Sequence, residues 1–145
     1  MGFFDDQMYF SQEQRVCDGG ATEASEDVYD FGVASPNVAK GEPITLLFTV
    51  DEVFAGTATT LTITLQSSSD NAVADPYADI AGITTGAIAK ATLVAGYNFT
   101  LTLPAFAVYE RYLRVMYTGD NTFETTGKIS CRQALNYQTN KAPGA

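Results

Sequence analysis

Glu110, Arg111 and Arg114 place one carboxylate and two guanidinium groups within five residues of the stretch ERYLRVMYTG, residues 110–119. Such groups can pair across adjacent strands or bind a neighbouring subunit, and exposed pairs of this kind contribute about 0.2 to 1 kcal/mol each. The chain has no histidine, which removes Ser/His and Cys/His nucleophile pairs, histidine metal ligands and the usual general base near neutral pH. A glycosidase needs only two carboxylates about 5 to 10 Å apart in a cleft, but the acids here fall mostly in loops and near the N-terminus. We therefore expect a protein without enzymatic activity.

Two loops are rich in the oxygen ligands that calcium prefers. DNAVADPYAD offers Asp70, Asn71, Asp75 and Asp79, and TGDNTFE, residues 118–124, offers three more such side chains. Neither spacing matches a defined calcium loop, and Asp and Asn are the usual residues of turns. The turn interpretation is favoured, and we expect no metal and no cofactor.

The two cysteines, Cys17 and Cys131, lie far apart in the sequence. Cys131 falls at an inward position of its predicted strand, where a small buried thiol is the ordinary expectation. A disulfide between them is not expected in a protein made in a reducing cytoplasm.

Alternation of apolar and polar residues predicts a series of short strands. In TLTITLQS, residues 60–67, Leu61, Ile63 and Leu65 alternate with threonine and glutamine in strict period two, which indicates a half-buried strand. In residues 110–118 the same parity places Leu113 and its odd-numbered neighbours Val115 and Tyr117 in the core. The other predicted strands are DVYDFGV (around 28–33), PITLLFTV (43–50, with Leu47 partly covered on the outer face), ADIAGI (78–83), AKATLV (89–94), YNFTLTL (97–103) and GKISCRQAL (127–135).

About eight short strands separated by breakers such as SSSDNAVADP, with no convincing helix, favour an all-β fold. The expected architecture is a two-sheet antiparallel β-sandwich or jelly roll, because two sheets must bury each other's apolar faces. The length of 145 residues suits one domain. We expect an acidic N-terminal arm over 1–25, the sandwich over 26–135 and a C-terminal tail over 136–145, since both flanks lack a sustained period.

The net charge of −9 is concentrated in the N-terminal arm: residues 1–30 hold eight acids and one base. Eight Lys and Arg residues scattered singly over the chain do not form the basic stripe that nucleic acid requires. The start MGFFDDQMYF lacks the charged and hydrophobic regions of a secretory signal, and no run of about 18 apolar residues could span a bilayer. We expect a soluble protein made in a cytoplasm that binds neither nucleic acid nor membrane.

The arm also holds five large apolar side chains beside Asp5 and Asp6. They either cover the sandwich of their own chain or anchor into another protein, with the acids facing basic groups on that partner. Composition alone leaves both interpretations open. The candidate partner-binding residues are Phe3, Phe4, Asp5, Asp6, Met8, Tyr9, Phe10, Glu110, Arg111, Arg114 and Tyr137.

The order and spacing of several stretches resemble the cement, or decoration, proteins of certain short-tailed bacteriophages. These stretches are GEPITLLFTVDEVF (41–54), TLTITLQSS (60–68), ATLVAGYNFTLTLP (91–104), ERYLRVMYTG (110–119) and TGKISCRQALNYQTN (126–140). The resemblance implies a non-enzymatic jelly-roll protein of the virion, made in the host cytoplasm. It would sit on the outer capsid surface, bridge neighbouring subunits of the major capsid protein of the same phage, and associate with itself as a dimer or trimer.

A carbohydrate-binding jelly roll of a viral surface or fibre protein is the alternative function. It requires an exposed aromatic platform, for which Tyr77, Tyr97 and Tyr109 are the candidates, while the absence of tryptophan counts against it.

Overall fold

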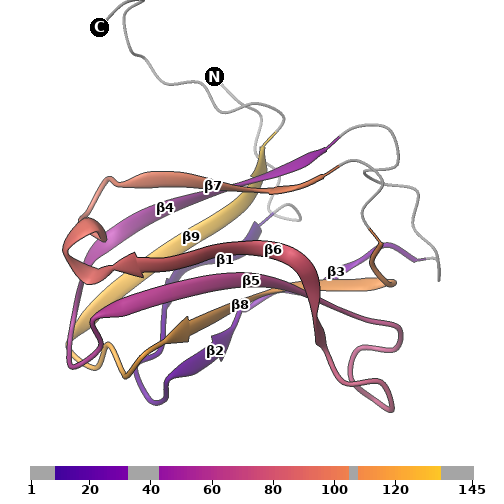
Figure 1. Ribbon diagram of the computed structural model, residues 1–145, viewed down its shortest axis with the longest axis horizontal. Coiled ribbons are helices and arrows are strands. Elements are labelled where there is room, and N and C mark those ends of the chain that lie inside the picture. The colour runs from indigo at the N-terminus through magenta and orange to yellow at the C-terminus, as the bar shows by residue number, and fades with distance from the viewer. Residues whose placement is uncertain (1–8, 33–42, 105–107, 135–145) are drawn as a thin grey trace, which may run out of the picture.

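The computed structural model describes residues 9–32, 43–104 and 108–134. The described residues form nine strands and one short 3-10 helix (Figure 1). The elements are β1 (Tyr9–Arg15), β2 (Thr22–Ala24), β3 (Tyr29–Asp30), β4 (Ile44–Ala55), β5 (Thr60–Ser68), β6 (Ala78–Ala89), η2 (Lys90–Thr92), β7 (Asn98–Leu103), β8 (Tyr112–Gly119) and β9 (Thr126–Ala134).

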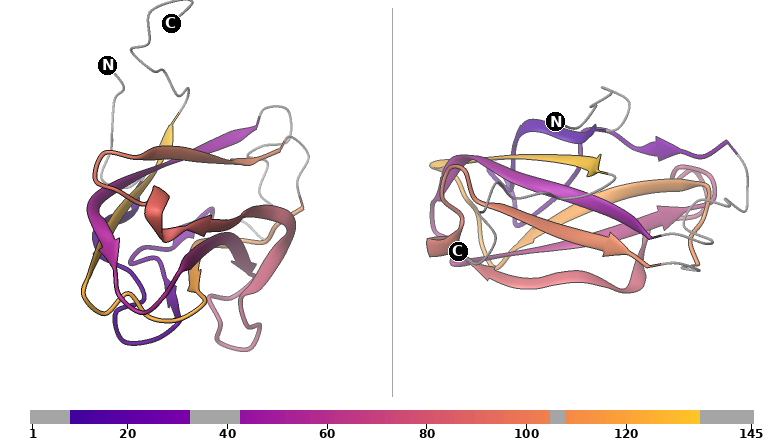
Figure 2. Two further views of the ribbon diagram at one scale, coloured as in Figure 1. Left: turned by 60° about the vertical axis from the view of Figure 1, so that its left-hand side comes forward. Right: turned by 90° about the horizontal axis from the view of Figure 1, so that it is seen from above.

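The strands form two antiparallel sheets packed face to face (Figures 1 and 2). Sheet A has the order β1-β9-β4-β7, and sheet B has the order β2-β8-β5-β6, with β3 pairing with β8 beyond the end of β2. Successive strands cross repeatedly between the sheets, which is the connectivity of an eight-stranded jelly roll to which β3 is added. The predicted fold class, an all-β antiparallel sandwich, is confirmed.

The predicted alternation determines which side chains fill the space between the sheets. Leu61, Ile63 and Leu65 of β5 are fully buried, and in the register they lie opposite Gly119, Tyr117 and Val115 of β8. The intervening residues of both strands are half-buried on the outer face of sheet B. Leu47 is buried on the outer face of sheet A, where the sequence predicted that it would be partly covered.

Two parts of the sequence-based prediction are wrong. Residues 89–94, AKATLV, do not form a separate strand: β6 continues to Ala89, and η2 then turns the chain toward β7. From Tyr9 onward the predicted arm belongs to the sandwich, because β1 pairs with β9 and β2 pairs with β8. Residues 1–8 and the predicted tail, 136–145, lie outside the described residues.

Candidate protein-binding surface

Glu110 and Arg111 directly precede β8 and Arg114 lies within it, and we call these three residues the β8 rim. Arg111 makes a two-point contact with Asp30 of β3, with Nε donating to Oδ1 at 2.7 Å and an Nη donating to Oδ2 at 3.0 Å. The Arg111 guanidinium also lies over the Tyr112 ring, 5.0 Å from its centroid. The hydrogen bonds from Arg111 lower the pKa of Asp30, so the pair stays charged at neutral pH. Both side chains remain well exposed.

Arg114 is fixed by a second set of contacts on the outer face of sheet B. Its Nε donates to Gln66 Oε1 at 2.9 Å, and its guanidinium stacks over the Tyr77 ring at 4.0 Å from the centroid. Gln66 in turn donates to Asp79 at 2.8 Å. The planar cation therefore has a defined orientation before any partner binds.

Glu110 lies beside the acidic loop between β5 and β6. A hydrogen bond with Asp75 raises the pKa of Glu110 above its ordinary value, because the proton is shared with a second carboxylate. Hydrogen bonds from Ser69 lower the pKa of Asp75, and the contact with Glu110 adds to this effect. The β8 rim thus presents two oriented guanidinium groups beside a carboxyl pair.

The N-terminal candidates separate into two groups. Phe3, Phe4, Asp5, Asp6 and Met8, like Tyr137 near the other end, lie outside the described residues. Tyr9 is half-buried in β1. Phe10 is only 5 % exposed and joins the core cluster, where it faces Tyr29 at a ring distance of 6.5 Å. Phe10 therefore covers its own sandwich, as one of the two open interpretations proposed, and is not available as an anchor.

A buried polar network between β1 and sheet B was not predicted from the sequence. Ser11 Oγ donates to Gln14 Oε1 at 2.6 Å and lies 2.8 Å from the hydroxyl of Tyr117. Gln14 Nε2 donates to the Ala24 carbonyl at 2.8 Å, while its Oε1 accepts the Glu26 N–H at 3.0 Å. Since Ser11 belongs to sheet A and Tyr117 to sheet B, these bonds tie the two sheets together at the β1 edge.

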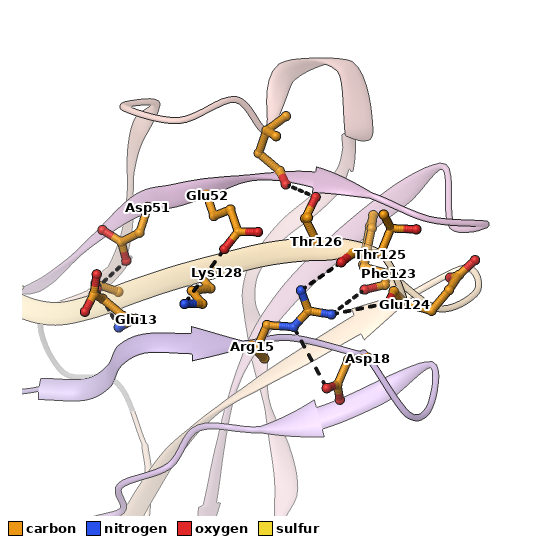
Figure 3. A network of polar contacts seen from close by, with 12 residues as sticks. Glu13, Arg15, Asp18, Asp51, Glu52, Phe123, Glu124, Thr125, Thr126 and Lys128 are labelled. Carbon is orange, nitrogen blue, oxygen red and sulfur yellow. Dashed lines mark hydrogen bonds and ion pairs between the residues drawn. The ribbon is translucent and has the colours of Figure 1, made fainter.

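Polar contacts also cross the outer face of sheet A (Figure 3). Arg15 points toward the turn before β9 and donates to the carbonyl oxygens of residues 123–125 at 3.2 to 3.4 Å. Lys128 lies 3.8 Å from Glu52, and both side chains are more than one third exposed. Ser130 Oγ donates to Asp51 at 2.5 Å and accepts the Glu13 N–H at 3.0 Å. These contacts join β1, β9 and β4 on one surface, so this face is also polar and ordered.

The two oxygen-rich loops use their acids as turn residues. Asp70 accepts the N–H groups of residues 73–75 at 2.8 to 3.1 Å. Asp120 accepts hydrogen bonds from the Thr59 hydroxyl and from the N–H groups of Thr59 and Thr60, and Glu124 accepts hydrogen bonds from the hydroxyl and N–H of Thr57, so both hold the loop between β4 and β5. These hydrogen bonds lower the pKa of Asp120 and that of Glu124 to about 2. Across the described residues, no group of three or more Cys, Asp or Glu side chains is arranged to hold a metal ion.

Both cysteines are free thiols buried in the core. Burial raises the pKa of Cys17 to about 11 and that of Cys131 well above its ordinary value. The predicted buried thiol at Cys131 is confirmed, and the expected absence of a disulfide agrees with both cysteines being free.

The three tyrosines considered for glycan binding have different environments. Tyr109 is 7 % exposed and packs against Phe31 at 5.3 Å. Tyr97 is half-buried and stacks on Phe99 at 5.5 Å. One face of Tyr77 is covered by the Arg114 guanidinium. Each ring is thus engaged by a neighbour of its own chain.

The fold and the candidate residues together define a jelly-roll β-sandwich with ordered polar surfaces on both outer faces and at the start of β8. No helix in the described part of the chain is long and apolar enough to cross a membrane. The chain belongs to the Bbp16 family, whose model matches residues 10–132, from β1 to β9. A search of curated proteins found no match.

Proposed function

We propose that this protein is a non-enzymatic structural protein of a phage virion, which binds the outside of the capsid and cements neighbouring subunits of the major capsid protein. Membership of the Bbp16 family over most of the chain and the resemblance of five stretches to phage cement proteins support this function. In this proposal the protein is made in the host cytoplasm and acts on the outer capsid surface, where it stabilises the shell.

The observation that carries the proposal is the organisation of the β8 rim. Arginine and tyrosine are enriched among the residues that dominate protein interfaces, and here two guanidinium groups are held by Asp30, Gln66 and Tyr77. Pre-oriented side chains lose little conformational entropy when a partner binds. The rim would therefore dock against carboxylate or carbonyl groups of a shell subunit with little reorganisation.

Cementing requires contacts to more than one subunit. The outer faces of the two sheets lie on opposite sides of the sandwich, and the β8 rim adjoins the outer face of sheet B, so contacts on the two sides can be made to different neighbours. Several weak contacts made at once bind much more tightly than any of them alone, because the second contact forms at a high effective concentration.

The test mixes purified protein with emptied capsids of its phage and measures co-sedimentation and the temperature at which the shells burst. We expect Arg111→Ala combined with Arg114→Ala to weaken binding roughly tenfold or more, as for interface arginines. Lys90→Ala is the matched control: it removes a cation from η2, outside both sheets, where Lys90 Nζ donates to the Gly56 carbonyl at 2.8 Å. Wild-type protein that neither co-sediments nor raises the bursting temperature would exclude the cement function.

The role of the N-terminal aromatics is tested separately. Deleting residues 1–8 removes Phe3, Phe4 and Met8 without cutting β1, which begins at Tyr9. If these residues anchor the protein, the shortened chain binds capsids more weakly and melts at the same temperature. Unchanged binding would remove them from the interface.

A further inference from the structure

The two arginines of the β8 rim differ in how their charge is balanced. Arg111 forms a two-point pair with Asp30, with N–O distances of 2.7 and 3.0 Å. Arg114 donates instead from Nε to the neutral side chain of Gln66, and no carboxylate in the described part of the chain lies within ion-pair distance of it. The hydrogen bonds to Asp30 raise the pKa of Arg111, whereas burial lowers the pKa of Arg114. Arg114 is therefore a partly desolvated cation without a counter-charge of its own.

The unused edge of the Arg114 guanidinium has a fixed orientation. The Tyr77 ring covers one face of the cation at 4.0 Å, and Gln66 accepts the Nε–H at 2.9 Å. Gln66 is itself held by a hydrogen bond to Asp79 at 2.8 Å. Within residues 9–32, 43–104 and 108–134, no acceptor binds the two Nη groups. These two groups form the end of a planar fork that can donate to both oxygens of one carboxylate.

The outer face of sheet B around Arg114 has the composition of a protein interface. Tyr112 and Met116 occupy the neighbouring outward positions of β8, and both are half-buried. Arginine, tyrosine and methionine are enriched at the centre of protein interfaces, where lysine and glutamate are depleted. Asp79, the acid nearest in the hydrogen-bond network, accepts from Gln66. A sheet face of this kind suits the surface of another protein, whereas small ligands take concave pockets.

We propose that Arg114 binds a carboxylate through its two Nη groups, and that on the capsid this carboxylate belongs to an acidic side chain of the major capsid protein. The inference rests on the proposed function and deepens it, since it assigns the anion receptor to Arg114 and not to the closed Arg111–Asp30 pair. Hydrogen bonds between two charged groups are roughly twice as strong as neutral ones. Because folding has already oriented and partly desolvated the guanidinium, binding a carboxylate requires little further ordering.

The carboxylate site is tested first in solution, without a capsid. The isotope-labelled protein is titrated with sodium acetate, with sodium chloride at the same ionic strength as the reference, and the arginine side-chain N–H signals are followed by NMR. The Arg114 signals, identified by their loss in Arg114→Gln, should move and saturate with acetate, and those of Arg111 should move less. Equal responses to acetate and chloride would overturn the site. Binding of sialic acid more than tenfold tighter than acetate would identify a sugar as the ligand and overturn the protein partner.

The second experiment uses emptied capsids whose surface carboxylates have been converted to neutral amides with carbodiimide and ethanolamine. On untreated capsids Arg114→Gln should bind roughly tenfold more weakly than wild type, and Arg114→Lys, which keeps the charge without the planar fork, should lie between them. On treated capsids wild type and Arg114→Gln should bind alike. Arg111→Gln with Asp30→Asn removes the closed pair without changing the net charge and should weaken binding less than Arg114→Gln. Circular dichroism and melting check that each variant folds.

Three results with capsids would overturn the inference: Arg114→Gln binding as well as wild type, a tenfold difference that persists on treated capsids, or a larger loss in the variant without the closed pair. Capsid binding that does not need Arg114 would refute this inference alone and leave the cement function in place. A protein that binds acetate at Arg114 but never binds capsids would refute the proposed function and leave the carboxylate site in place.

Discussion

Replacing Gln14 by leucine tests whether the buried network holds β1 in the sandwich. Gln14 is 5 % exposed, and its amide group makes three hydrogen bonds: from the Ser11 hydroxyl, to the Ala24 carbonyl and from the Glu26 N–H. Leucine has a similar volume, so the change removes the polar partner and creates little cavity. Ser11 keeps its contact with Tyr117.

Two backbone groups, the Ala24 carbonyl and the Glu26 N–H, then lose their partner. An unsatisfied buried group costs about 1 to 3 kcal/mol. Because both bonds are only partly buried, water can compensate in part, and we take about 1 to 2 kcal/mol for each. The expected loss is about 2 to 4 kcal/mol, which lowers the Tm of a chain of this size by roughly 5 to 15 °C.

Urea unfolding followed by circular dichroism and tyrosine fluorescence measures this loss, since the chain has eight tyrosines and no tryptophan. Gln12→Leu is the matched control: the same substitution on the same strand, at an exposed position, should change stability by less than about 0.5 kcal/mol. Hydrogen exchange should speed up first in β1 and β2. Equal stability of the two variants would show that the network contributes nothing and that β1 is held by Phe10 and its backbone pairing alone.

Three further outcomes follow from the loops and the core. The pKa values of Asp120 and Glu124 are about 2 in the folded protein and near 4 in the unfolded chain, so their contribution to stability is complete above about pH 4.5 and is lost as the pH falls toward 2. The double variant Asp120→Asn with Glu124→Gln should therefore flatten the acid dependence of the urea midpoint. An unchanged profile would contradict this. Gly127→Ala should destabilise by about 1 to 3 kcal/mol, because a Cβ there would lie 2.8 Å from the Phe54 ring at a φ of 147°; a wild-type Tm would refute it. Cys17, buried and with a pKa of about 11, should react with iodoacetamide only when the protein unfolds, and fast labelling of the native protein would show that its site opens.

The alternation of apolar and polar residues in the sequence predicted those strands whose inward positions are all apolar. In β5, β7 and β8 the core positions follow the parity of Leu61, Leu101 and Val115, because each strand is regular and buries one face. β1 could not be found in this way. Its buried positions are Phe10, Ser11 and Gln14, of which two are polar and two are adjacent, and Glu13 at φ 49° lies where the register shifts, so no period-two pattern appears.

The site residues were predictable individually, while their partners were not. The segment from Glu110 to Arg114 is conspicuous in the sequence by charge, but Asp30 lies 81 residues from Arg111. Tyr77 approaches Arg114 only because the β5–β6 connection returns beside β8. Such contacts depend on the strand order of the folded chain, which local patterns do not specify. The phage-cement function stays a prediction after the fold is known, since a jelly roll serves many functions.

The buried network and the β8 rim are linked through a single strand. Tyr117, which meets Ser11 between the sheets, and Arg114, which lies on the outer face, both belong to β8. Asp30, the partner of Arg111, belongs to β3, which reaches β8 only after the chain has passed through β1 and β2. Releasing β1 therefore loosens the strand and the counter-charge that orient the rim, so Gln14→Leu should weaken capsid binding as well as lower stability.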